Sequence, residues 1–100
     1  MMSDNLVIEM ISKENCSHCM ELKEEFSTRG IQYKEYDYLS LVSNKDTKRL
    51  FILKNRKVTT TPAVLIYLDD WLIDCIEYTK RGLSAVLDSI DSARKKAVSI

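Results

Sequence analysis

The sequence has little of the residues that interrupt or cross-link a chain: one proline, two glycines and three cysteines among 100 residues. Three cysteines are too few, and odd in number, for a scaffold held together by disulfides. Basic and acidic residues are equal in number, at 15 each, so the chain lacks the net charge on which most nucleic-acid binding depends. It also lacks an apolar run approaching the ~20 residues that a membrane helix needs. We therefore expect neither a nucleic-acid nor a membrane partner.

The N-terminal segment does not have the pattern of a signal peptide. Residues 1–5 include no basic residue, and Glu9 interrupts the apolar run that follows. We therefore expect a cytoplasmic protein in a reducing compartment, where a close pair of cysteines is typically catalytic or metal-binding rather than structural. The length and the apolar content of 45% indicate a single domain over residues 1–100.

Segments with strand character alternate with segments of helical periodicity. The strands are predicted at 6–11, 31–38, 63–68 and 71–78, the second at an edge of the sheet and the last two joined by a hairpin turn at 69–70. The helices are predicted from 17 to 29, from a Ser43/Asp46 capping box to about 55, and from 83 to 97. In the middle helix we expect Phe51 to make apolar contacts, and we place Trp71 in the core or at its rim.

The resulting order of elements is β-α-β-α-β-β-α. The two most apolar strands, 6–11 and 63–68, belong at the centre of the sheet, because strands covered by helices on both faces lose their alternation of polar and apolar residues. The first helix crosses between parallel strands, and the hairpin adds an antiparallel edge. This pattern predicts an α/β fold with one four-stranded mixed sheet flanked by three helices.

Cys16 and Cys19 form a Cys-x-x-Cys motif between the first predicted strand and the first predicted helix. Two intervening residues on the first helical turn bring the sulfurs within bonding distance. Cys16 would face the free N–H groups and the positive end of the helix dipole, which lower the pKa of a thiol from its free value of about 8.5. Cys16 would then attack a substrate disulfide, and Cys19 would resolve the mixed disulfide.

Zinc binding is the alternative interpretation of the motif. A structural zinc ion needs four ligands, and the chain offers only the two cysteines, His18 between them and the distant Cys75. We therefore predict no metal site. Cys75 itself is expected to be a small buried hydrophobic residue.

Two further features lie close to the predicted dithiol. His18, the only histidine, would favour the thiolate of Cys16 and make the pair more oxidising if protonated; the alternative is an exposed polar residue. The only proline, Pro62, precedes the third strand. A cis Thr61–Pro62 bond would present backbone N–H and C=O groups to an extended substrate, whereas the alternative is an ordinary trans proline at the start of a strand.

Residues 12–19, Ser-Lys-Glu-Asn-Cys-Ser-His-Cys, resemble the Ser-Lys-x-x-Cys-Pro-Tyr-Cys signature of glutaredoxins, and Thr60-Thr61-Pro62 resembles their Thr-Val-Pro. The resemblance implies a thioredoxin-like fold and a thiol–disulfide oxidoreductase with Cys16 as nucleophile. It also implies that substrate or glutathione contacts the residues around the dithiol. These are Lys13, Ser17, His18, Thr61 and Pro62. For Lys13, the alternative is an exposed loop lysine.

The same resemblance implies partners. They are proteins that contain disulfides, such as a ribonucleotide reductase, and an electron donor that is either glutathione or a flavin-dependent reductase. It implies no tightly bound cofactor, and we expect a monomer.

Three departures from the glutaredoxin pattern define the alternatives. Ser17 replaces the usual proline, as in glutaredoxins that carry an iron–sulfur cluster with glutathione. The Gly-Gly-x-Asp motif that binds the γ-glutamyl end of glutathione is missing after the last strand, so no residue is assigned to that contact. Residues 79–83, Thr-Lys-Arg-Gly-Leu, are instead similar to the C-terminal part of thioredoxin. The alternatives are therefore a cluster-carrying glutaredoxin and a thioredoxin-type electron donor independent of glutathione.

Overall fold

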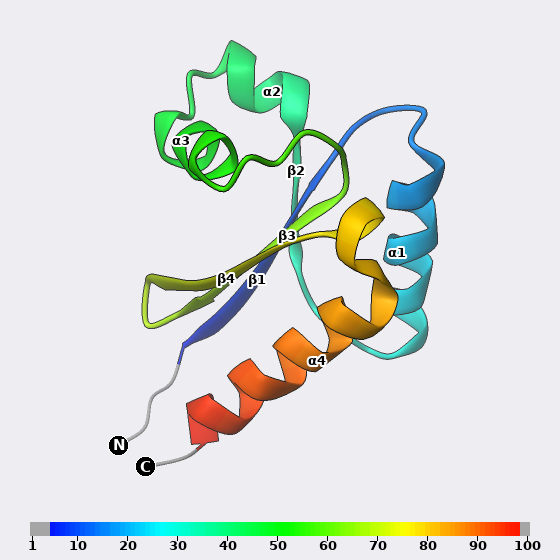
Figure 1. Cartoon of the computed structure of the whole chain (residues 1–100), viewed down its shortest axis with the longest axis vertical. Helices are drawn as coiled ribbons and strands as arrows, with labels where there is room; N and C mark the ends of the chain where they lie inside the picture. Colours follow the sequence, from blue (N-terminus) through cyan, green and yellow to red (C-terminus); the bar gives the residue numbers. More distant parts are fainter. Residues whose placement is uncertain (1–4, 99–100) are drawn as a thin grey trace.

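The two most apolar segments form the centre of a four-stranded sheet in the computed structural model, which describes residues 5–98 (Figure 1). The strands are β1 (Leu6–Ser12), β2 (Lys34–Asp37), β3 (Ala63–Leu68) and β4 (Trp71–Glu77). They lie in the order β2-β1-β3-β4, with β1 and β2 parallel and the other pairs antiparallel. The predicted α/β fold with a mixed sheet is confirmed.

The hairpin between β3 and β4 follows from its turn residues. Asp69 and Asp70 both have positive φ, at 51° and 70°. Two consecutive residues with positive φ are what a two-residue turn needs to match the twist of the strands that it joins. The turn places Leu68 opposite Trp71, and a register shift between Ile66 and Tyr67 then places Ala63 opposite Glu77. This pairing brings the end of β4 to the start of β3.

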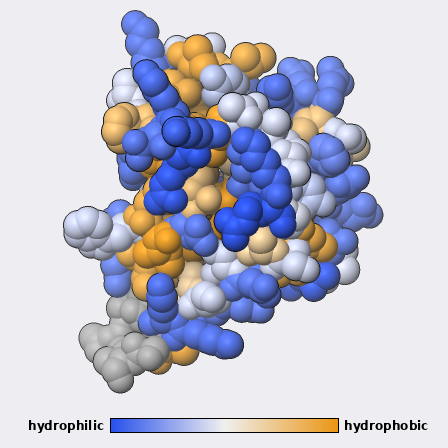
Figure 2. Space-filling model, viewed as in Figure 1, coloured by the Kyte–Doolittle hydropathy of each residue, from blue (hydrophilic) through white to orange (hydrophobic). Residues whose placement is uncertain are grey.

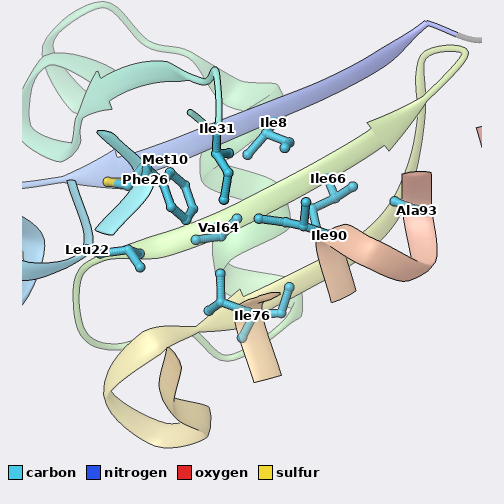
Figure 3. Packing of buried hydrophobic residues seen from close by; sticks show 11 residues of the cluster. Ile8, Met10, Leu22, Phe26, Ile31, Val64, Ile66, Ile76, Ile90 and Ala93 are labelled. Carbon is cyan, nitrogen blue, oxygen red and sulfur yellow. The ribbon is translucent and has the colours of Figure 1, made fainter. Parts of the chain in front are cut away.

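Helices cover both faces of the sheet. They are α1 (Ser17–Thr28), α2 (Tyr38–Ser43), α3 (Thr47–Asn55) and α4 (Tyr78–Val98). Figure 1 shows α1 and α4 on one side of the sheet, with α2 and α3 toward the other. Residues of α1 and α4 pack with one face of β1, β3 and β4 in the larger core, shown in Figure 3. Phe26 and Leu22 of α1 are fully buried there, as their helical spacing predicts.

The middle of the chain forms two helices where the sequence predicts one. Ser43 is the last residue of α2 instead of the cap of a longer helix, so the predicted capping box is wrong. The carboxylate of Asp46 caps α3 by accepting a hydrogen bond from the N–H of Arg49, at 3.2 Å. Lys45 has a φ of 54° between the two helices, and this left-handed turn prevents a continuous helix.

Two aromatic residues lie outside the core, contrary to their predicted positions. Phe51 of α3 is 67% exposed and Trp71 at the start of β4 is 76% exposed. In α3, Leu53 is the buried residue, and Phe51, two positions earlier, points to another side of the helix. The strand predicted at 31–38 is also shorter in the structure. Pairing with β1 begins only at Lys34, and Ile31 is buried in the connection between α1 and β2.

The last helix begins with an irregular turn. Gly82 has φ 86° and ψ 174°, a conformation inside α4 that is not helical and that only glycine adopts readily. The regular helix follows from Leu83, as predicted, and buries Val86, Ile90 and Ala93. The turn before Gly82 therefore belongs to the connection between β4 and the helix.

An ion pair inside the protein joins α3 to β1. The guanidinium of Arg49 donates two hydrogen bonds to the carboxylate of Glu9, at 2.9 and 2.6 Å, and a third to Asp46. Glu9 is only 4% exposed. The hydrogen bonds to Glu9 raise the pKa of Arg49 above its ordinary value, so the guanidinium stays charged.

The surface in the view of Figure 2 mixes hydrophilic and hydrophobic residues. Hydrophobic side chains gather over α2, where Leu39 and Val42 are exposed. No helix within residues 5–98 combines the length and the apolar character needed to cross a membrane.

Candidate active site

The dithiol lies where the chain leaves β1 and enters α1. Cys16 is the N-cap of this helix, with extended backbone angles, and its sulfur accepts a hydrogen bond from the N–H of Cys19 at 3.1 Å. The structure shows the oxidised form, in which Cys16 and Cys19 form a disulfide. The sulfur of Cys16 thus occupies the place of a capping oxygen, facing N–H groups that have no partner inside the helix.

The two sulfurs lie in different environments. Cys16 is partly exposed, whereas Cys19 is 1% exposed on the buried side of α1. The N–H groups and the dipole at the start of a helix stabilise a negative charge at Cys16 once the disulfide is reduced. Burial opposes charge on the Cys19 thiol. The geometry therefore distinguishes an accessible nucleophile from a protected second thiol.

The loop before β3 lies against the outer sulfur. The Thr61–Pro62 peptide bond is cis, as one of the two sequence interpretations predicts. The hydroxyl oxygen of Thr61 lies 3.3 Å from the sulfur of Cys16, and its carbonyl oxygen lies 3.7 Å away. Pro62 is fully buried behind it. The structure thus brings Cys16, Thr61 and Pro62 together across 45 residues of sequence.

Ser17 and His18 are exposed on the first turn of α1. The Nδ1 atom of His18 lies 3.3 Å from the carboxylate of Glu21, and its ring centroid lies 6.0 Å from that of Tyr78. These contacts place the imidazole toward Glu21 and the start of α4. Its effect on the thiolate stays a prediction.

Among solved structures, the fold is similar to the crystal structure of glutaredoxin 1 from Francisella tularensis complexed with cacodylate. The match has a TM-score of 0.51 and covers 88% of this chain and 99% of that chain. The chain has a glutaredoxin-like fold. At 18% sequence identity the likeness establishes the fold alone. Neither a protein-family model nor a curated protein matches the sequence.

A groove opens beside Thr61 in this glutaredoxin-like fold. It has a volume of about 270 Å³ and lies between the loop before β3 and the start of α2. Val58 and Leu53 contribute apolar lining, and Lys13 and Tyr38 contribute polar atoms. Lys13 is exposed, so its ammonium group is available to an anionic group of a bound molecule.

Glu77, at the end of β4, belongs to the site although the sequence analysis assigned it no role. One of its carboxylate oxygens, Oε2, accepts hydrogen bonds from the N–H groups of Thr59 and Thr60, at 3.1 and 2.8 Å. The hydroxyl of Thr60 donates to the same oxygen at 2.5 Å, and Lys80 lies 3.2 Å from the other oxygen. A lone acidic residue at the end of a strand has no recognisable sequence pattern, because these threonine partners are 17 and 18 residues away.

The ionisation of Glu77 follows from this environment. Burial alone raises the pKa of its carboxyl, but hydrogen bonds from Thr60, Thr59 and Lys80 outweigh it and lower the pKa to about 2. The side chain is therefore a carboxylate at neutral pH, held by the loop that carries Thr61.

The described residues do not by themselves form a site for an iron–sulfur cluster. Such clusters are held by several cysteine thiolates. Within residues 5–98 no three His, Cys, Asp or Glu side chains lie together as a metal-binding group, and Cys19 is buried. Cys16 alone could reach a cluster whose other ligands came from outside the chain.

Proposed function

We propose that this protein is a thiol–disulfide oxidoreductase in which Cys16 is the nucleophile and Cys19 the resolving thiol. The observation that carries the proposal is the partly exposed sulfur of Cys16 at the N-cap of α1, paired with the buried sulfur of Cys19. A helix start stabilises a thiolate, and the thiolate is the form that attacks disulfides.

The proposed cycle begins with the reduced dithiol. The thiolate of Cys16 attacks one sulfur of a substrate disulfide, so that a mixed disulfide forms and the other substrate sulfur leaves as a thiolate, which takes up a proton. Cys19 loses its proton and attacks the sulfur of Cys16, which releases the second substrate thiol. Two electrons pass to the substrate, and Cys16 and Cys19 end as the disulfide that the structure shows.

Replacement of single cysteines tests the proposal. In an insulin or hydroxyethyl disulfide assay, Cys16→Ser should abolish reduction, while Cys75→Ser, on the edge strand β4, should retain it. Cys19→Ser should accumulate the mixed disulfide with Cys16, detectable by mass spectrometry. Full activity of the Cys16→Ser protein would contradict the proposal.

For substrates and donor, we propose protein disulfides and either glutathione or a flavin-dependent reductase. The groove beside Thr61 supports an extended substrate, whereas the missing Gly-Gly-x-Asp motif leaves glutathione without one of its usual contacts. One disulfide substrate should be assayed with glutathione plus its reductase, and separately with thioredoxin reductase. Activity with only one donor decides between them. A cytoplasmic location and a monomeric state stay predictions.

A further inference from the structure

We propose that Glu77 is a positioning residue for Cys16: its carboxylate fixes the loop over residues 59–61 so that the hydroxyl of Thr61 stays against the sulfur. The inference rests on the proposed function, because it concerns the nucleophile of that reaction. Glu77 does not itself contact the sulfur in this arrangement; it acts through the loop.

The first step of the argument is the anchoring of the loop on its N-terminal side. The N–H groups of Thr59 and Thr60 both point at one carboxylate oxygen of Glu77, and the Thr60 hydroxyl donates to the same oxygen. Hydrogen bonds to a charged acceptor are stronger than those between neutral groups. Glu77 is 7% exposed, so water cannot readily replace the carboxylate as acceptor.

The second step is the anchoring on the C-terminal side of Thr61. The N–H of Tyr78 donates to the carbonyl oxygen of Pro62 at 3.1 Å, and Ala63 lies opposite Glu77 in the β3–β4 ladder. Thr61 thus lies between two points at which the loop is hydrogen-bonded to residues 77 and 78. The Thr60 hydroxyl also pairs with that of Thr79, which adds a third contact to this segment.

The third step is the effect on sulfur. The Thr61 hydroxyl lies 3.3 Å from the sulfur of Cys16, within hydrogen-bonding distance for sulfur. A hydroxyl that donates to a thiolate favours the charged form and lowers the pKa of the thiol. Loss of the Glu77 acceptor frees the loop, and the hydroxyl no longer has a fixed place against Cys16.

The test measures the pKa of the Cys16 thiol directly. In a Cys19→Ser background, the rate at which Cys16 is alkylated is followed against pH by mass spectrometry of its peptide. Glu77→Ala should raise the pKa of Cys16 by about one, which lowers the thiolate fraction about tenfold at a pH below the pKa. Glu77→Gln retains an acceptor oxygen and should stay close to the parent protein.

A matched control separates positioning from stability. Glu9→Ala removes another buried carboxylate, which binds Arg49 beneath α3, and it should reduce stability without moving the pKa of Cys16. If Glu77→Ala does not fold, Glu77→Asp provides the second variant. It keeps the charge but shortens the side chain by one methylene, which moves the acceptor away from the loop. It should therefore also raise the pKa of Cys16.

A double change tests the route through Thr61. In a protein that already carries Thr61→Val, Glu77→Ala should produce no further rise in the pKa of Cys16. An unchanged pKa in folded Glu77→Ala, or an equal rise in Glu9→Ala, would overturn the proposal. Because alkylation needs no disulfide substrate, this outcome is distinct from a failure of the wild-type protein to reduce disulfides.

Discussion

Lowering the pH should reduce the free energy of unfolding by a predictable amount, because the carboxylate of Glu77 becomes protonated. Burial raises the pKa of its carboxyl, but the hydrogen bonds from Thr60 and Thr59 and the ammonium of Lys80 lower it from an ordinary 4.5 to about 2. The folded-state pKa therefore lies below the unfolded one. The ionised carboxylate stabilises the fold above pH 4.5, and this contribution is lost as the pH falls toward 2.

The magnitude follows from the two pKa values. A pKa that is lower by one in the folded state corresponds to about 1.4 kcal/mol of stability. For Glu77 the contribution to the free energy of unfolding at neutral pH is therefore about 3 kcal/mol. By pH 3 most unfolded chains carry the proton and most folded ones do not, so about 2 kcal/mol of that contribution is gone.

Urea unfolding of the oxidised protein measures this loss. The wild-type protein and Glu77→Gln are compared at several pH values from 7 to 3, and their difference in free energy of unfolding should shrink by about 2 kcal/mol at the acid end. Glu24→Gln, which removes an exposed carboxylate from α1, provides the matched control. A difference between wild type and Glu77→Gln that stays constant with pH would refute the reasoning.

Three substitutions test other parts of the structure. Arg49→Met leaves Glu9 buried without its partner and should cost about 3–5 kcal/mol in urea unfolding; a loss below about 1 kcal/mol would contradict the role of this pair. Gly82→Ala should cost about 1–3 kcal/mol, because the φ of 86° strains any other residue although the added methyl meets no atom within 4 Å. An unchanged melting temperature would exclude that strain. Thr61→Val removes the hydroxyl beside Cys16 and should slow its alkylation by up to about tenfold below the thiol pKa; a wild-type rate would show that the hydroxyl does not act on the sulfur.

Local patterns predicted the dithiol, the central strands and the main helices. The spacing of Cys16 and Cys19 was sufficient because residues three apart at a helix start lie on one turn. The apolar runs of β1 and β3 predicted the centre of the sheet, because only strands covered on both faces can be apolar throughout. Helical spacing of the apolar residues also accounts for the burial of Phe26 in α1 and Ile90 in α4.

Prediction failed where a residue's partner is far away in the sequence or where a single backbone angle decides. Phe51 and Trp71 were misplaced because apolar character alone does not say which side of an element meets the core. The positive φ of Lys45 separates α2 from α3 where one helix was predicted, and a lysine in a sequence does not indicate a left-handed turn. The partners Arg49 and Glu9 are 40 residues apart, so no local pattern joins them.

The sequence by itself determined the chemistry available to this protein: two thiols one helical turn apart at the start of a helix, after a buried strand. Only the tertiary structure decided what surrounds them. The register of β3 and β4 brings Glu77 to the loop that carries Thr61, and the loop in turn to Cys16. The physical reason is that sequence spacing sets contacts within one element, whereas contacts between elements depend on how the whole sheet pairs.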